Sequence, residues 1–298
     1  MTTPQMISAE VLALKRTIPR PSIPVYAFHR FQQRIRNPQL RKRVSDAIAM
    51  FRPKNKSSAR PDMTVLNRDG VQMFPGYLTP DHAAELRAIL SEMKCRDPWK
   101  PEHGTFMLAD APAGTHVADI VEAPLLKAAH DIAFDERLLG LASEYFGSVP
   151  YVDSIQAWWS LSGNEEPEEA ENFHRDNDSI RFLKFFLYLT DVDDEQGPHK
   201  FVRGSHVEPK LLGTDRLTDP EVEVTFGPDR ILTMKGRAGD AFIEDTFGVH
   251  KGQLPIAGTR LLLQVRYSVT PTIFRSRLTV AGPAPERAST AISLIHDD

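Results

Sequence analysis

His174 and Asp176 are separated by one residue and lie just before a long apolar run, 182–189. In an extended segment, residues i and i+2 point to the same side, so this imidazole and this carboxylate can reach one point. They would supply two of the three ligands of a 2-His-1-carboxylate site, which leaves positions on iron open for other molecules. A His-x-Asp pattern also occurs in ordinary solvated turns, so this interpretation depends on residues elsewhere in the chain.

His250 is the best candidate for the third ligand. It lies 76 residues after His174, in the segment 247–252 that follows an apolar run at 241–243, and Arg260 begins another apolar run ten residues later. A guanidinium that points into a β-barrel is costly unless it meets a carboxylate, which it can grip through two parallel hydrogen bonds. Taken separately, His250 also fits a structural histidine and Arg260 a surface strand residue. The order and spacing of the four residues favour a metal site with an arginine for a dicarboxylate.

The chain around these residues has a β character. After residue 147, short apolar runs are separated by turns rich in Gly, Pro and Asp, which is typical of a sandwich or a barrel. No alternation of strands and helices with a glycine-rich phosphate loop is present, so we do not expect a doubly wound sheet. The strands are expected at 151–159, 182–189, 201–202, 222–226, 231–234, 241–243 and 261–267.

The region before these strands predicts both extended pieces and helices. We expect extended segments at 64–66 and 71–74. Thr79 is followed by a proline, which is typical of an N-cap and a first helical residue, and so predicts a helix. A second helical region is expected over about 124–146, ending at Gly147.

Several motifs, in this order, resemble the phytanoyl-CoA dioxygenase family. That family's pattern has His-x-Asp, a strand ending in Leu-Thr-Asp-Val-Asp, Gly-Pro, Gly-Ser-His, Gly-Asp, a distal His and an Arg about ten residues later. In this chain the motifs lie at 174–176, 189–193, 197–198, 204–206, 239–240, 250 and 260. The resemblance covers about residues 64–270, and several motifs that agree in order are more specific than any one of them.

The resemblance implies a mainly β fold with flanking helices, built on a double-stranded β-helix (jelly-roll, cupin-like) core. It implies Fe(II) held by His174, Asp176 and His250, and 2-oxoglutarate held by Arg260. O2 and 2-oxoglutarate would then be used to hydroxylate an aliphatic C–H of a small or medium organic molecule, such as a lipid, a sugar or a natural product. The same residues would also serve desaturation or cyclisation. An alternative is a catalytically inactive jelly-roll binding module.

Three more residues have roles that the sequence leaves open. Some relatives place a co-substrate-binding glutamine near Gln156, which also fits an ordinary polar strand residue. Lys184 interrupts the apolar run 182–189 and either touches an anionic substrate or co-substrate or faces solvent. Asp178 is the alternative ligand if the register of the His-x-Asp segment is shifted. Asp176 argues against a halogenase, because related iron halogenases carry a small residue in its place.

Charge is unevenly distributed along the chain. The first 60 residues carry 13 Lys and Arg against two acids, a net charge of +11, and the remainder carries −15. We expect a basic N-terminal arm at 1–61 and a jelly-roll oxygenase domain at 62–298. The arm should hold a short amphipathic helix, since four apolar residues recur at helical spacing: Leu40, Val44, Ile48 and Phe51. This helix would suit weak contact with an anionic membrane, or packing on the acidic body of the protein itself. No nucleic-acid partner is expected.

Other features limit the class of protein. Cys95 is the single cysteine, so no intramolecular disulfide can form. The N-terminus lacks the pattern of a secretory signal, and no apolar stretch reaches the roughly 18 residues that a membrane span needs. We therefore expect a cytoplasmic protein, with peripheral membrane contact through the arm. The acidic run 165–171 leads into His174 and is expected to be a solvated loop, a lid, or a dock for the arm.

Overall fold

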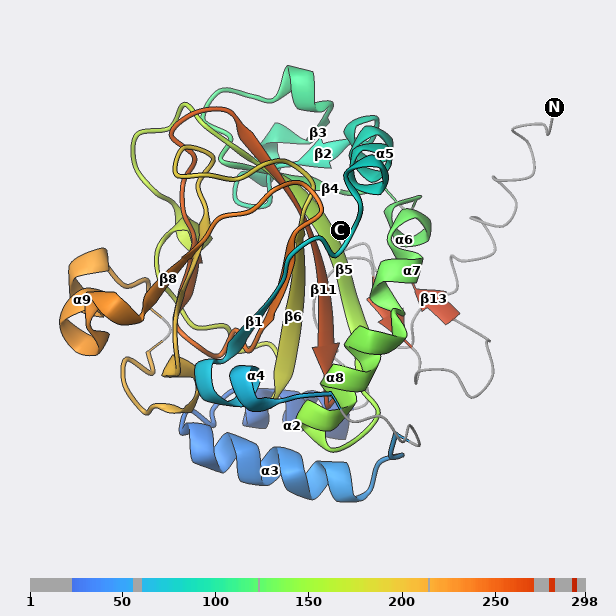
Figure 1. Cartoon of the computed structure of the whole chain (residues 1–298), viewed down its shortest axis with the longest axis vertical. Coiled ribbons are helices and arrows are strands. Elements are labelled where there is room, and N and C mark those ends of the chain that lie inside the picture. The colour runs from blue at the N-terminus through green and yellow to red at the C-terminus, as the bar shows by residue number, and fades with distance from the viewer. Residues whose placement is uncertain are drawn as a thin grey trace.

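Two antiparallel sheets form the core of the protein (Figure 1). The computed structural model describes residues 23–55, 61–122, 124–213, 215–270, 279–281 and 291–293. The large sheet has the strand order β1-β9-β6-β11-β5-β4-β2-β3, the small sheet the order β10-β7-β8, and β12 pairs with β13. The bounds are β1 Val71–Phe74, β2 Cys95–Arg96, β3 Thr105–Phe106, β4 Val117–Ile120, β5 Tyr151–Leu161, β6 Phe182–Tyr188, β7 His199–Val202, β8 Ile231–Met234, β9 Ala241–Glu244, β10 His250–Gly252, β11 Thr259–Ser268, β12 Thr279–Ala281 and β13 Ala291–Ser293. The predicted mainly β jelly-roll fold is confirmed.

Strands β5, β11 and β6 form the centre of the large sheet, and their alternation separates its two faces. Because successive side chains of a strand point to opposite sides, β5 and β11 each present one row to each face. One row packs into the main hydrophobic core: Ile155, Ala157, Trp159, Leu261, Leu263 and Val265. The other row lines a cavity: Ser154, Gln156, Trp158, Ser160, Arg260, Leu262, Gln264 and Arg266. The same two strands therefore provide both the core and the floor of the cavity.

Helices cover the core face of the large sheet (Figure 1). The predicted helix after Thr79 is α5, Pro80–Ser91, and the Thr79 hydroxyl accepts a hydrogen bond from the backbone N–H of His82 at 3.3 Å. The predicted helical region near 124–146 is present as three helices, α6 Pro124–Ala128, α7 His130–Ala133 and α8 Glu136–Phe146. Gly147 ends α8 with a left-handed backbone (φ 68°), which glycine adopts without strain.

Two segments that were expected to be extended are helical. The strand prediction at 64–66 is wrong, because α4 spans Thr64–Asp69 and ends at a left-handed Gly70. The strand prediction at 222–226 is also wrong, since α9 spans Asp219–Phe226. In α9, Thr218 and Glu221 form a reciprocal capping box, with the Thr218 N–H donating to Glu221 Oε2 at 2.8 Å. Local capping outweighs the weak strand preference of the β-branched residues in this segment.

Two helices of the basic arm lie at the edge of the molecule opposite β2 and β3, α2 Ile23–Gln32 and α3 Pro38–Met50 (Figure 1). The short amphipathic helix predicted there is present as α3, and the apolar residues of its stripe divide, since Val44 and Ile48 pack against the main core. Arg41, Ser45 and Ala49 are buried on α3, whereas Leu40 is exposed.

Arg41 ties this helix to the body of the protein. Its Nη1 donates to Asn177 Oδ1 at 2.8 Å, and its Nη2 donates to the carbonyl of Ser179. The arm therefore packs just beyond the His-x-Asp segment, while the division of the chain at residue 61 remains a prediction. Among the described residues, no helix is both long and apolar enough to cross a bilayer.

Candidate active site

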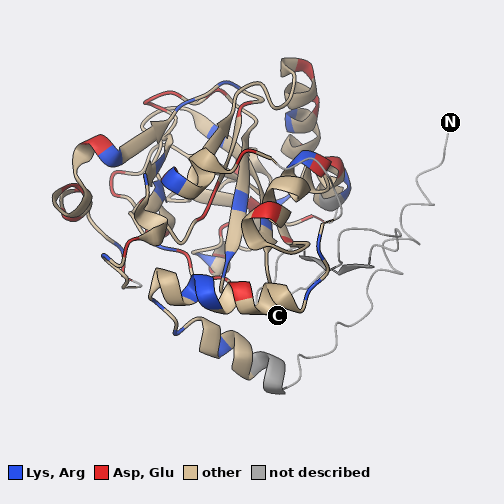
Figure 2. Ribbon diagram, turned by 60° about the horizontal axis from the view of Figure 1, so that its bottom comes forward, with Lys and Arg blue, Asp and Glu red and all other residues tan. Residues whose placement is uncertain are grey.

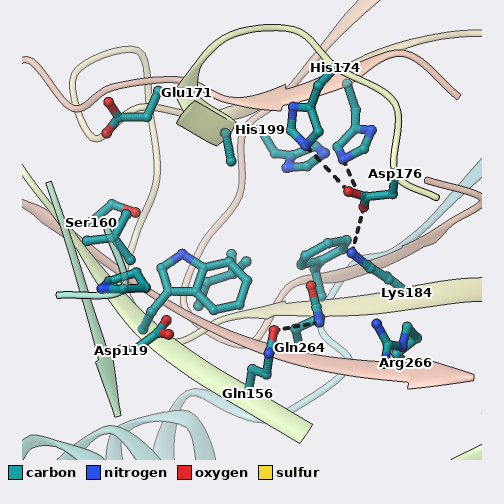
Figure 3. Close-up of a pocket in the computed structure, with 18 of the residues that line it drawn as sticks. Asp119, Gln156, Ser160, Glu171, His174, Asp176, Lys184, His199, Gln264 and Arg266 are labelled. Carbon is teal, nitrogen blue, oxygen red and sulfur yellow. Dashed lines mark hydrogen bonds and ion pairs between the residues drawn. The ribbon is translucent and has the colours of Figure 1, made fainter. Parts of the chain in front are cut away.

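His174, Asp176 and His250 converge although they come from two distant segments. Figure 3 shows the first two of them at the cavity. His174 and His250 face each other in an antiparallel bridge, in which each backbone N–H donates to the other's carbonyl, at 2.9 and 3.0 Å. The N–H of Asp176 donates to the carbonyl of Thr246 at 2.9 Å. One potential ligand atom from each of the three side chains lies within 4.8 Å of the others. Backbone pairing thus places the two imidazoles and the carboxylate around one point.

Hydrogen bonds orient both imidazoles of this cluster. Nδ1 of His174 lies 2.9 Å from the carbonyl of Asn172, and Nδ1 of His250 lies 2.9 Å from the carbonyl of Gly248. A carbonyl only accepts, so each Nδ1 carries the proton and each Nε2 is left as a potential metal ligand. The Nε2 atoms lie 3.6 and 3.4 Å from the carboxylate oxygens of Asp176.

The pKa values of the two histidines are shifted in opposite directions. Burial, and then repulsion from His250, lowers the pKa of His174 to about 3, so this ring is neutral as a metal ligand must be. Burial also acts to lower the pKa of His250, but the carboxylate of Asp176 outweighs it and the pKa is raised. Two imidazoles and one carboxylate fit divalent iron and leave coordination positions free.

Arg260 lies buried on β11 and lines the same cavity. Its Nη2 donates to the Ser160 hydroxyl at 2.9 Å, whereas its Nε is buried without a hydrogen-bond partner. Burial lowers the pKa of this guanidinium. A Cβ atom at Gly252 would lie 3.1 Å from Nη2, so the glycine keeps room beside it. The guanidinium retains hydrogen-bonding capacity that an incoming carboxylate can use.

Lys184 points at the predicted ligand Asp176 (Figure 3). Its Nζ lies 2.6 Å from Asp176 Oδ2 and 3.1 Å from Asp178 Oδ2. Burial acts to lower the pKa of Lys184, but these two carboxylates outweigh it and the pKa is raised. Asp178, the alternative ligand, is held by Lys184 and by Arg266 Nη1 at 2.9 Å, so it is Asp176 that groups with the two histidines.

The cavity has a volume of about 270 Å³ and its floor is polar. Gln156 is part of this floor and accepts a hydrogen bond from Gln264 Nε2 at 3.1 Å across the β5–β11 pair (Figure 3). Beyond it, Arg266 Nε contacts Asp153 Oδ1 at 2.6 Å. Arg266 has the same orientation as Arg260 six residues earlier, so alternation along the strand was a signal for its location that the sequence interpretation did not use.

A second buried pair, His199 and Glu244, lies next to the metal cluster, and His199 lines the same cavity. His199 Nε2 is 2.9 Å from Glu244 Oε1, and the His199 ring stacks on His250 with centroids 5.6 Å apart. Burial lowers the pKa of His199 and raises the pKa of Glu244 to about 8, so both groups are uncharged near neutral pH. Glu244 was not identified from the sequence, because nothing local distinguishes it from a surface acid.

The acidic run 165–171 lies beside the cavity and is tied to the body of the protein. It contains a helical turn at Glu169–Glu171, whose last residue lines the cavity. The contacts of the run are Lys100 to Glu168 at 3.2 Å, Arg216 to Glu169 at 2.6 Å and His116 to Glu171 at 2.7 Å. Glu165, Glu166 and Glu169 are exposed, as expected of a solvated loop, whereas Glu171 is buried. The three contacts join the run to the body of the protein, and a dock for the arm stays a prediction.

Comparisons with known proteins agree with this fold. A family model described as phytanoyl-CoA dioxygenase (PhyH) matches residues 66–253, and no curated protein matches the chain in sequence. The epimerase SnoN in complex with Fe3+, alpha ketoglutarate and nogalamycin RO is 21% identical, with a TM-score of 0.51 over 79% of this chain and 94% of SnoN. EctD from S. alaskensis in its apoform is 16% identical, with a TM-score of 0.53 over 72% of this chain and 80% of EctD. HygX from Streptomyces hygroscopicus with nickel and 2-oxoglutarate bound is 17% identical, with a TM-score of 0.50 over 81% of this chain and 98% of HygX.

At these identities the structural likenesses show the shared fold. The family model spans more than half of the chain and includes His174, Asp176 and His250. The chain therefore belongs to the phytanoyl-CoA dioxygenase family of Fe(II)- and 2-oxoglutarate-dependent oxygenases.

Proposed function

We propose that this protein hydroxylates an aliphatic C–H of a small or medium organic molecule, using Fe(II), 2-oxoglutarate and O2. The observation that carries the proposal is the convergence of His174, Asp176 and His250 in a cavity that also contains Arg260. An inactive binding module has no need to keep two histidines in the tautomer that frees both Nε2 atoms.

The proposal assigns a role to each of these residues. His174, Asp176 and His250 would hold the iron, and Arg260, with the Ser160 hydroxyl, would hold a carboxylate of 2-oxoglutarate. When bound, iron and 2-oxoglutarate would supply the oxidising chemistry. O2 would convert 2-oxoglutarate to succinate and CO2, and one of its oxygen atoms would enter the substrate. The protein's own part is to bind, to orient and to exclude water.

Lys184 has a positioning role in this proposal. Its ammonium donates to Oδ2 of Asp176 at 2.6 Å, which fixes the orientation of the carboxylate and occupies one of its two oxygens. Neighbours of a metal ligand that hold it in this way commonly change metal affinity or activity by about 10–100-fold when they are replaced. Gln156 and Gln264 would contact the substrate from the floor, since Gln156 Nε2 and Gln264 Oε1 are not used in the bond between them.

The proposal is tested by anaerobic binding and by turnover. Fe(II) and 2-oxoglutarate should together give a visible charge-transfer band in the wild type, and O2 should then yield succinate even without substrate. Asp176→Ala and His250→Ala should lose both signals, whereas His130→Ala, which changes a surface histidine, should keep them. Absence of iron binding by the wild type would favour the binding module.

The type of reaction is tested separately once a substrate is known. Hydroxylation adds one atom of labelled oxygen from O2 to the product, as mass spectrometry can detect. A product that lacks two hydrogens and contains no label would replace hydroxylation by desaturation or cyclisation at the same site.

A further inference from the structure

Helix α2 buries polar side chains and exposes aromatic ones. His29 and Gln32 are almost fully buried, and Gln32 Nε2 lies 3.0 Å from His29 Nδ1. Phe28 and Phe31, one helical turn apart, are exposed. A helix that packs on a protein core normally shows the opposite arrangement, with its apolar stripe inward. Over residues 27–32, the part of α2 whose burial the structure describes, the aromatic side chains therefore face outward.

Helix α3 divides its apolar residues between two sides. Val44 and Ile48 pack against the main core, next to the buried Arg41. Leu40 and Met50 are exposed, and Phe51, which follows the helix, is 89% exposed. In Figures 1 and 2, α2 and α3 lie next to each other at the same edge of the molecule. We call their outward-facing apolar residues the arm face: Phe28, Phe31, Leu40, Met50 and Phe51. Nearly half of the large apolar side chains that the structure describes as exposed belong to this face. Single exposed apolar residues are common on protein surfaces, but a group of them on neighbouring helices is typical of an interaction site.

Positive charge surrounds the arm face. Residues 23–55 carry eight Lys and Arg but one acid, Asp46, and Figure 2 shows blue segments on both helices. Asp46 is already paired, with Lys42 Nζ at 2.6 Å and Arg181 Nη1 at 3.6 Å. Arg30 on α2, Arg34 in the turn after it and Arg43 on α3 are exposed. A partner that suits this surface is apolar where the aromatic residues insert and anionic around them.

We propose that the arm face docks the protein on an anionic lipid bilayer, as a peripheral contact that does not cross the bilayer. The phenylalanines and Met50 would enter the boundary between headgroups and acyl chains, and the arginines would contact lipid phosphates. A second copy of this chain would place equally basic faces against each other, which charge repulsion opposes. On the acidic body, the exposed large apolar side chains that the structure describes are spread over several elements, among them Val65 on α4, Ile89 on α5 and Val224 on α9.

The full-length protein should bind vesicles of phosphatidylcholine with about 30% phosphatidylserine, and not vesicles of phosphatidylcholine alone. The binding should weaken as salt is raised, because added ions screen exposed charges. Arg34→Gln with Arg43→Gln should weaken partitioning by more than about tenfold, since each basic residue contributes roughly fivefold near an anionic surface. Phe31→Ser with Phe51→Ser should weaken it by about tenfold or more.

A matched control uses two exposed apolar residues elsewhere. Val224, which is 88% exposed on α9, and Ile256 are changed to serine together. This variant should bind the vesicles like the wild type, and all variants should keep the wild-type melting temperature and uncoupled 2-oxoglutarate turnover.

Three results would overturn the proposal. One is the absence of binding between the wild-type protein and anionic vesicles. Another is equal binding by the Phe31/Phe51 variant and the control variant. The third is a wild-type dimer, seen by light scattering, that the Phe31/Phe51 variant abolishes without any vesicle binding, which would make the arm face a contact between two copies.

Discussion

Replacing Lys184 by methionine should destabilise the metal-free protein strongly. The ammonium of Lys184 lies between two carboxylates, 2.6 Å from Asp176 Oδ2 and 3.1 Å from Asp178 Oδ2, and all three groups are largely shielded from solvent. Methionine keeps the length of the side chain and removes the charge. Because two buried carboxylates then lose their shared partner, we expect the free energy of unfolding to fall by about 3–5 kcal/mol.

A double-mutant cycle separates this charge effect from lost packing. Asp178→Asn removes one of the two carboxylates that Lys184 neutralises. This substitution should therefore lower the free energy of unfolding less in the Lys184→Met variant than in the wild type. We expect the double variant to be more stable than additivity predicts by about 2 kcal/mol. Urea denaturation in the presence of a chelator measures all four proteins.

Lys235 supplies the control for this cycle. Its Nζ lies 2.6 Å from Asp194 Oδ2, the same distance as in the buried pair, but both side chains are well exposed. Lys235→Met should change stability by less than about 1 kcal/mol, because exposed ion pairs are weak. A Lys184→Met variant as stable as Lys235→Met, or an additive cycle, would contradict the described network.

Four further outcomes are expected. Arg260→Lys should raise the KM for 2-oxoglutarate by about 10–100-fold in uncoupled turnover, because an ammonium cannot reproduce a two-point grip; an unchanged KM would remove Arg260 from the co-substrate site. Gly252→Ala should raise the same KM severalfold while leaving the melting temperature almost unchanged, since its Cβ would press on Arg260 Nη2 from 3.1 Å. Burial raises the pKa of Glu244 to about 8, so the native state holds a proton that the unfolded state releases near pH 4.5. The free energy of unfolding should therefore fall as pH rises from about 5 to about 8. Glu244→Gln should flatten that slope in urea denaturation measured across this range. Burial raises the pKa of the Cys95 thiol to about 12, so a thiol-exchange reagent should react only after unfolding, and rapid reaction with the native protein would count against the burial of Cys95.

The sequence predicted the elements whose signals are local and strong. The apolar runs of β5, β6 and β11 are long and bounded by turns, and Thr79 and Gly147 are good capping residues. The spacing of His174 and Asp176 correctly placed both side chains on one side of an extended segment.

The sequence-based predictions fail where two local signals compete, or where the outcome depends on contacts between residues far apart in the chain. Val222–Phe226 has the composition of a strand, but a capping box three residues apart at Thr218 and Glu221 starts a helix there. The sequence left open whether the apolar stripe of α3 meets a membrane or the body of the protein. In the structure the stripe divides, with Val44 and Ile48 against the core and Leu40 exposed. The helix is held there by Arg41, whose partners Asn177 and Ser179 lie more than 130 residues away. Glu244 and His199 could not be paired from sequence for the same reason, since they meet only when β9 and β7 face each other.

The reciprocal hydrogen bonds between His174 and His250 have a consequence for substitutions at the site. The approach of the two segments is set by main-chain pairing, which does not depend on the side chain at either position. Replacing one imidazole should therefore leave the backbone of the other residue in place, so such a variant would report the loss of one ligand and not the loss of the fold.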